Sequence, residues 1–174
     1  MRRGELAGLR WIDVNLDAGL LSLRNTRVSV GYTVHEYEPK SRSSRRAIAL
    51  DERVVAVLRT HRRRQLEERL LWGPAYDDTG YVFTNENGSP LHPELITVLF
   101  TRHCNTLGLA KIRLHDLRHT SASLMLTAGV HPKIVSERLG HASIAITLDL
   151  YSHVIPSMQT DAAERLGSII LGGR

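Results

Sequence analysis

The chain has 174 residues, enough for one domain that buries roughly 70% of the surface exposed by its unfolded form, so a stable core needs no cross-links. Its single cysteine, Cys104, excludes an internal disulfide and suits a reducing cytoplasm, and no apolar run nears the ~20 residues that cross a membrane. The net charge of +5 favours a polyanionic partner, and residues 1–64 concentrate it, with 14 Lys and Arg against 7 Asp and Glu.

Short runs of alternating apolar and polar residues in the first third of the chain predict β-strands. The expected strands are Leu9–Val14, Leu20–Leu23, Tyr32–Glu36 and Arg46–Leu50. A turn at Asp17-Ala18-Gly19 separates the first two, and together the four predict a small antiparallel sheet. Lys40 falls in the connection between the last two strands, which is rich in Ser and Arg and is an exposed place for a side chain that must reach a substrate.

A long helix is predicted to follow the N-cap residue Asp51 and to reach about Leu71, ahead of Gly73-Pro74. Five apolar residues are expected on its buried side, namely Val54, Val55, Leu58, Leu66 and Leu70. Beyond it, Tyr81–Thr84 is predicted to be a short strand or extended segment before a turn at Asn87-Gly88.

Proline and glycine mark the ends of the helices expected in the second half of the chain. These are Pro93–Leu107, Asp116–Ala128, Pro132–Gly140, Ser143–Tyr151 and Ser157–Leu166. No internal repeat or low-complexity tract interrupts them. The predicted fold is therefore a single α+β domain, mostly helical, in which a small antiparallel sheet packs with a helical bundle.

The basic cluster Arg62-Arg63-Arg64 has two interpretations. It can contact DNA phosphates, or it can form the solvated face of the long helix. Charge runs most often serve solubility, so the second interpretation is favoured.

Two imidazoles, a guanidinium and a phenol follow one another near the end of the chain, at His115, Arg118, His141 and Tyr151. An arginine stays protonated, and its planar fork matches two phosphate oxygens, while a tyrosine hydroxyl can attack phosphorus and hold a broken strand covalently. Each residue alone has an ordinary interpretation, as a helix cap, a surface ion pair or a half-buried core aromatic. Their occurrence together, in this order, favours phosphodiester chemistry.

This pattern resembles the C-terminal signature of the tyrosine recombinase (phage integrase) family, which reads His-x-x-Arg, then Leu-Gly-His, then Tyr. Two upstream segments resemble the family as well. Arg2-Arg3-Gly4-Glu5-Leu6 is similar to the segment of the first active-site arginine, which maps to Arg2, and Pro39 to Arg46 is similar to the hairpin of the catalytic lysine, which maps to Lys40. The resemblance runs from Arg2 to about Val154.

The resemblance implies a role for each of these residues. Tyr151 would be the nucleophile, His115 its base or hydrogen-bonding partner, and Lys40 the proton donor to the departing 5′-oxygen. The two arginines, Arg2 and Arg118, would bind the non-bridging oxygens of the phosphate, to which His141 would donate a further hydrogen bond.

No metal or nucleotide cofactor is expected. His115 and His119 are four residues apart, but Asp116-Leu117-Arg118 between them lacks the Glu of a zinc helix, and a guanidinium beside a cation is unfavourable. No glycine-rich phosphate loop is present. His119 and His153 lie outside the family's catalytic set and are expected to be structural.

The resemblance also implies partners and a place in a larger protein. Family members bind duplex DNA and act as a synaptic tetramer, and residues 156–174 correspond to the tail that docks on a neighbouring protomer. The chain is expected to be a catalytic domain truncated at its N-terminus, acting on the nucleoid in the cytoplasm. By itself it is expected to be an incomplete enzyme, with at most trace cleavage and no complete recombination. Two other functions remain open from the sequence: a DNA-binding remnant that does not cleave, and a topoisomerase that nicks and reseals DNA with the same residues.

Overall fold

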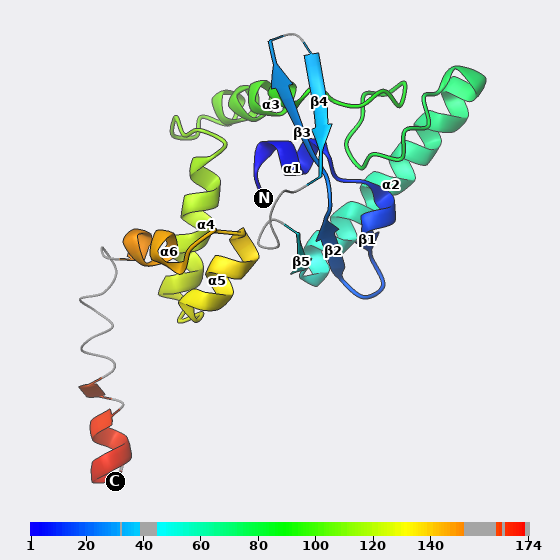
Figure 1. The fold of residues 1–174 in the computed structure, drawn as a ribbon. Helices are drawn as coiled ribbons and strands as arrows, with labels where there is room; N and C mark the ends of the chain where they lie inside the picture. Colours follow the sequence, from blue (N-terminus) through cyan, green and yellow to red (C-terminus); the bar gives the residue numbers. More distant parts are fainter. Residues whose placement is uncertain (32, 39–44, 152–162, 165, 173–174) are drawn as a thin grey trace. The chain divides into compact units, whose positions relative to one another are not determined.

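The computed structural model describes residues 1–31, 33–38, 45–151, 163–164 and 166–172, and the chain forms two compact units, Met1–Arg118 and His119–Arg174 (Figure 1). The strands of the described residues lie in the first unit and are β1 (Val14–Asn15), β2 (Leu20–Leu23), β3 (Thr26–Val30), β4 (Thr33–Tyr37) and β5 (Arg46–Ala49). The same unit contains α1 (Arg3–Ala7), η1 (Trp11–Asp13), α2 (Glu52–Trp72), η2 (Gly73–Ala75) and α3 (Pro93–Thr106). Helix α4 (Asp116–Thr127) begins at its end, and α5 (Pro132–Leu139) and α6 (Ile144–Tyr151) follow in the second unit.

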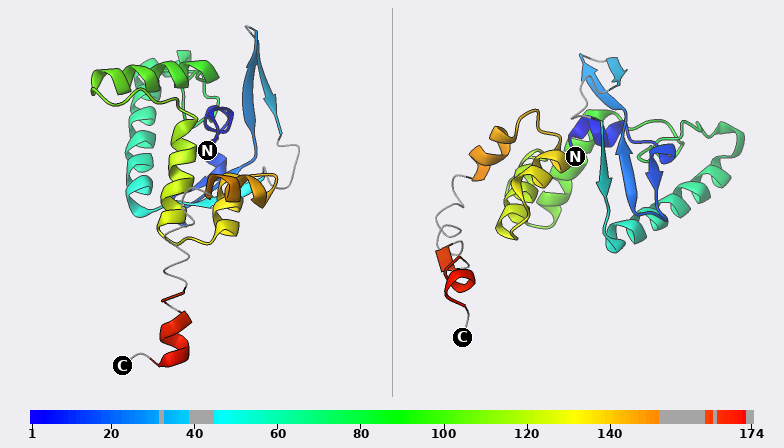
Figure 2. Two further views of the ribbon diagram at one scale, coloured as in Figure 1. Left: turned by 90° about the vertical axis from the view of Figure 1, so that its left-hand side faces the viewer. Right: turned by 60° about the horizontal axis from the view of Figure 1, so that its bottom comes forward.

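The core of the first unit lies between a three-stranded antiparallel sheet and α2. Strand β2 is central, and its Leu21 pairs with Val14 on β1 and Ile48 on β5. Helix α2 runs along one face of this sheet and contributes Leu58 to the same core (Figures 1 and 2). The predicted strands at Leu20–Leu23 and Arg46–Leu50 are confirmed, the second one residue shorter than expected, and so is the α+β class.

The strand predicted at Leu9–Val14 is wrong for most of its length. Arg10 forms an isolated antiparallel bridge with Tyr81, and the next three residues turn as η1, so only the last residue joins the sheet. The turn is favoured because the indole N–H of Trp11 donates to Gln65 Oε1 at 2.6 Å. A partner on α2, distant in sequence, thus overrides the local strand pattern.

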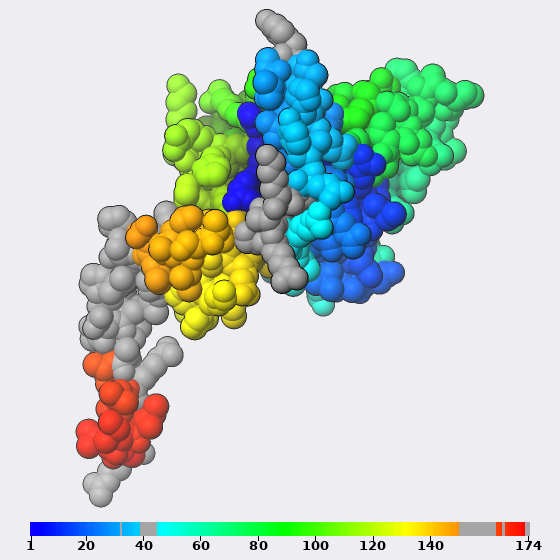
Figure 3. All heavy atoms as spheres, in the orientation of Figure 1, coloured from blue at the N-terminus to red at the C-terminus, as the bar shows by residue number. Residues whose placement is uncertain are grey.

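A separate hairpin of β3 and β4 is inserted in the sequence between β2 and β5. Of its two strands only β4 was predicted, as Tyr32–Glu36, whose first residue lies outside the described residues. Strand β3 was missed because both of its faces are partly exposed, so its sequence alternates only weakly between apolar and polar residues. Helix α1 approaches β3 very closely: a Cβ on Gly4 would lie 2.8 Å from the carbonyl oxygen of Arg27. The space-filling view shows the exposed surface of the hairpin (Figure 3).

A buried tyrosine holds both strands of this hairpin to the body of the unit. The hydroxyl of Tyr81 donates to Glu36 Oε2 at 2.6 Å and accepts from Arg10 Nη2 at 3.0 Å. The guanidinium of Arg27 lies 4.9 Å from the centre of the Tyr81 ring. Arg27 and Glu36 are paired opposite each other in the hairpin, so the single side chain of Tyr81 contacts β3 and β4 at the same pair of residues.

Helix α2 begins after Asp51, whose side chain accepts hydrogen bonds from Arg53 and Val54, as predicted. Its predicted buried side is wrong in part, since Val54, Leu66 and Leu70 are exposed, whereas Leu58 and Gln65 are buried. Gln65 Nε2 donates to Tyr81 O and Thr84 Oγ1, at 3.2 and 2.7 Å. Polar side chains occupy the core face of this helix because the segment that it packs against offers them hydrogen-bonding partners.

The basic cluster lies on exposed positions of α2. Arg62 lies over the Trp11 ring, with its guanidinium carbon 5.2 Å from the ring centre, and Arg64 pairs with Glu68 one turn later at 2.9 Å. These contacts agree with a solvated helix face, and contact of the cluster with DNA stays a prediction.

In the segment after α2, the strand predicted at Tyr81–Thr84 is reduced to isolated bridges at Tyr81 and Thr84, with bends at the two residues between them. The predicted turn at Asn87-Gly88 is present, and the φ of +84° at Gly88 favours glycine. Helix α3 begins at Pro93 and buries Cys104. Its predicted span is confirmed to within a residue.

The second unit has its own small core. Four apolar side chains from α4 and α5 form it, Ala122, Leu126, Val135 and Leu139. Gly140 ends α5 in the left-handed conformation, and Ser143 Oγ accepts from the backbone of Ala145 to start α6, both as predicted. The helix expected at Ser157–Leu166 lies largely outside the described residues, although residues 163–164 and 166–171 are helical.

Across the part of the chain that the structure describes, no helix has the length and apolarity needed to span a bilayer.

Candidate active site

Arg2 lies at the N-terminus of α1, where the carboxylate of Glu5 faces it. Glu5 Oε2 accepts from the backbone N–H of Arg2 at 2.7 Å, and Oε1 accepts from Arg2 Nη1 at 3.0 Å. An acidic residue at the third helical position satisfies backbone groups that the helix itself leaves unpaired, so this spacing favours the start of α1.

A second arginine, Arg46 at the start of β5, binds the same carboxylate. Its Nη1 and Nη2 lie 3.0 Å from Glu5 Oε1 and Oε2, and the two side chains are only 7% and 4% exposed. Burial alone would raise the pKa of Glu5, but hydrogen bonds and charge from Arg46 and Arg2 outweigh it and lower that pKa. Glu5 is therefore ionised at neutral pH.

Arg118 joins this group from the first turn of α4, where it is 5% exposed. Burial, followed by the positive charges of Arg2 and Arg46, lowers the pKa of Arg118 to about 10, while Glu5 acts in the opposite direction. It remains protonated at neutral pH. Three guanidiniums around one carboxylate leave a net charge of +2, which favours a bound anion with forked hydrogen-bonding geometry, such as a phosphodiester.

His115 immediately precedes α4 and is exposed. Its carbonyl oxygen accepts from the backbone N–H of Arg118 at 3.0 Å. Arg113 braces the same turn, because its backbone N–H and its guanidinium both bond to Asp116 at 2.9 Å. The predicted placement of His115 and Arg118 at a helix start is thus confirmed, with the imidazole exposed and the guanidinium buried.

In the second unit, His141 follows the left-handed Gly140 and is oriented by a residue of α6. Its Nδ1 lies 2.9 Å from Oγ1 of Thr147, which is fully buried. Tyr151 is the last residue of α6, one turn after Thr147, so the two positions lie on the same face of the helix.

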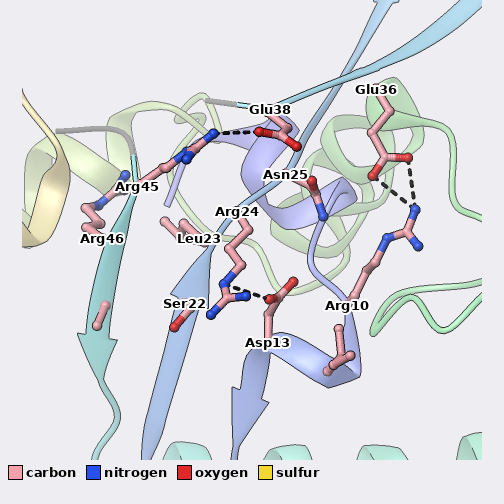
Figure 4. Close-up of a pocket in the computed structure, with 12 residues that line it drawn as sticks. Arg10, Asp13, Ser22, Leu23, Arg24, Asn25, Glu36, Glu38, Arg45 and Arg46 are labelled. Atoms are coloured by element: carbon pink, nitrogen blue, oxygen red, sulfur yellow. Dashed lines mark hydrogen bonds and ion pairs between the residues drawn. The ribbon is translucent and has the colours of Figure 1, made fainter. Parts of the chain in front are cut away.

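Lys40 lies outside the described residues, between β4 and β5. An open cavity of about 740 Å³ in the first unit is lined by residues that flank this segment, Glu38 and Arg45 (Figure 4). Arg45 pairs with Glu38 at 2.5 Å, and two further lining residues, Arg10 and Arg24, also bind carboxylates. Arg46 also lines this cavity, but the other arginines there are matched in pairs with carboxylates, so the cavity is a weaker anion site than the cluster around Glu5, to which Arg46 belongs.

The structure therefore brings together Arg2, Arg118 and the turn of His115 in the first unit, and His141 with the α6 position of Tyr151 in the second. Sequence reasoning did not assign functional positions to Glu5, Arg46 and Thr147. The three-residue spacing from Arg2 to Glu5 is a sequence pattern that could have indicated their contact. The pairing of Glu5 with Arg46 spans 41 residues, and no local sequence pattern indicates it. Within the described residues, no three His, Cys, Asp or Glu side chains are placed to hold a metal ion.

The fold is that of the catalytic domains of tyrosine recombinases. The family comparison agrees: the chain belongs to the phage integrase family, whose model matches residues 1–158.

A XerC-like tyrosine recombinase of Caldanaerobacter subterraneus is 33% identical over 98% of the chain, and the integrase of Staphylococcus phage L54a is 29% identical over 98%. The chain spans about half the length of these curated relatives, 47% and 49%.

Solved structures show the same fold. The Tn1549 transposon integrase in complex with transposon right end DNA matches 96% of the chain, and 55% of its own, with a TM-score of 0.79 at 24% identity. The XerA recombinase crystal structure matches 99% of the chain and 54% of its own, with a TM-score of 0.66 at 25% identity.

Proposed function

We propose that the chain is the catalytic part of a DNA strand transferase that cleaves and rejoins duplex DNA through a 3′-phosphotyrosyl link. The observation that carries this proposal is the cluster of Arg2, Arg46 and Arg118 around the single carboxylate of Glu5, a net positive site suited to one phosphodiester. Family membership supports it, because the relatives are named integrases and tyrosine recombinases.

In the proposed step, the hydroxyl oxygen of Tyr151 forms a bond to the scissile phosphorus and the bond from phosphorus to the 5′-oxygen breaks. His115 accepts the tyrosine proton or a hydrogen bond from the hydroxyl, and the ammonium of Lys40 gives a proton to the departing oxygen, which becomes a 5′-hydroxyl. Attack by a 5′-hydroxyl from a partner strand reverses the step. The phosphodiester energy is kept in the tyrosyl link, so neither a nucleotide nor a metal is consumed.

Negative charge grows on the non-bridging oxygens as the fifth bond to phosphorus forms. Fixed donors aimed at those oxygens stabilise this state more than the ground state, and Arg2 and Arg118 are the proposed donors. His141, oriented by Thr147, supplies a further hydrogen bond. Strand exchange between two duplexes also requires four protomers, so we propose that self-association on DNA precedes rejoining.

The test uses nicked duplexes of randomised sequence, in which the short cleaved strand diffuses away and traps a covalent protein–DNA adduct. Adducts are isolated in denaturing gels and their DNA is sequenced, which also identifies the target. The unsubstituted chain should form adducts and Tyr151→Phe should form none, although it binds the same DNA. An adduct that persists in the Phe variant would refute Tyr151 as the nucleophile.

The selected duplexes then separate strand exchange from topoisomerase action. A recombinase should join two duplexes that carry the selected sequence, whereas a topoisomerase should relax a supercoiled plasmid without pairing two sites.

A further inference from the structure

The Glu5 carboxylate is saturated with donors. Each of its oxygens accepts two hydrogen bonds, one from Arg2 and one from Arg46, at 2.7 to 3.0 Å. An ionised carboxylate offers about four acceptor positions, so any movement of Arg46 leaves two of them unfilled in a buried place.

The two arginines use this carboxylate differently. The side chain of Arg46 is 7% exposed and both of its terminal nitrogens bind Glu5, so its fork is occupied within the protein. The side chain of Arg2 is 42% exposed. Arg2 therefore reaches the surface where a phosphate would lie, while Arg46 holds the acid against which Arg2 is aligned.

We propose that Arg46 is a positioning residue of the phosphate site: by gripping Glu5 with both arms of its guanidinium, it fixes the orientation in which Arg2 meets the scissile phosphate. This inference rests on the proposed function. A fork is needed because a single ammonium can align with only one carboxylate oxygen at a time, which would leave the acid free to rotate.

The neighbouring residue provides a matched control. Arg45 also pairs with a glutamate, Glu38, but the two side chains are 58% and 76% exposed. Water screens exposed ion pairs of this kind, so they contribute little to stability or to the orientation of their side chains. The same substitution at Arg45 should therefore change nothing at the phosphate site.

The experiment compares Arg46→Gln, Arg46→Lys and Arg45→Gln in cleavage of the selected nicked duplexes, at saturating DNA and well below the unfolding temperature. Arg46→Gln should slow cleavage on the order of 10²-fold, because a misplacement of about 1 Å at a reacting centre has that effect, with an affinity for DNA within about threefold of the unsubstituted chain. Arg46→Lys should be slowed about tenfold, because it keeps the charge but not the fork. Arg45→Gln should behave like the unsubstituted chain.

The pH profile separates this role from a purely structural one. The charged groups that act on Glu5 are Arg2 and Arg46, and Arg118 interacts electrostatically with all three. Without Arg46, burial is the dominant influence and raises the pKa of Glu5, so the cleavage rate of Arg46→Gln should climb as pH rises through that new pKa. Adding Glu5→Gln to Arg46→Gln should remove the climb, because no ionisable acid is then left at this position.

Several outcomes would overturn the inference. These are an Arg46→Gln rate equal to that of Arg45→Gln, a slowed rate with an unchanged pH profile, a loss of DNA affinity as large as the loss of rate, or failure of both Arg46 variants to fold. Failure of the proposed function is a different result, because then the unsubstituted chain forms no adduct or Tyr151→Phe still forms one.

Discussion

Replacement of Gly4 by alanine tests how closely α1 lies against β3. In the interior of a helix this change normally stabilises a protein by roughly 0.5 to 1 kcal/mol, because glycine loses more backbone freedom on folding. Here a Cβ would lie 2.8 Å from the carbonyl oxygen of Arg27 and 2.8 Å from Cγ2 of Thr26. The first contact is with backbone, so a flexible side chain cannot relieve it and α1 must move away from β3.

Overpacking of this kind destabilises by typically about 1 to 3 kcal/mol, which exceeds the entropic gain, so the sign of the effect should reverse. We expect Gly4→Ala to lose about 2 kcal/mol of unfolding free energy. For a chain of this size that corresponds to a fall in the melting temperature of roughly 4 to 8 °C. Because Arg2 and Glu5 flank Gly4 on the same helix, cleavage should also slow at temperatures where the variant is folded.

Tryptophan fluorescence is a suitable assay, since both tryptophans of the chain, Trp11 and Trp72, lie in the first unit and report its unfolding. Gly167 provides the control: it is helical, and a Cβ there meets no described atom within 4 Å. Gly167→Ala should leave the fluorescence transition unchanged. A Gly4→Ala protein as stable as the parent, or more stable, would show that the close approach is relieved at little cost and would refute this reasoning.

Arg118→Ala should slow cleavage by at least about 10²-fold, or roughly 3 kcal/mol of transition-state stabilisation, with a smaller loss of DNA affinity; equal losses in the two measurements would make Arg118 a binding residue only. Thr147→Val keeps the shape of a fully buried side chain but removes the partner of His141 Nδ1. It should lower the unfolding free energy by about 1 kcal/mol and slow single-turnover cleavage more than Ser143→Ala, and an unchanged rate would mean that the imidazole is oriented by other contacts.

The sequence predicted those features that depend on neighbours along the chain. Asp51, Pro93 and Gly140 act on the backbone within a turn, so the helix boundaries that they mark agree with the structure to within a residue or two. The same holds for His115 and Arg118, because a three-residue spacing at a helix start determines their placement.

Features that depend on distant partners could not be predicted. Gln65 is buried because a carbonyl and a hydroxyl from the Tyr81–Thr84 segment accept hydrogen bonds from it. The spacing of apolar residues along a helix does not indicate that such partners exist. Likewise, Arg46 looks like one more cation in a basic stretch until the sheet brings it to Glu5, 41 residues earlier in the chain. Long-range hydrogen bonds thus decide which polar residues are interior.

Helix α6 sets the distance between the residue that orients His141 and the position of Tyr151. Thr147, in the first turn of this helix, contacts the ring of His141, and the position of Tyr151 follows one turn later on the same helix. One residue inserted between Thr147 and Tyr151 would swing the tyrosine by about 100° and advance it by about 1.5 Å. Between His141 and Tyr151, exchange of one apolar residue for another should therefore be tolerated and a change of length should not, whereas the connections before His141 can vary in length without altering this arrangement.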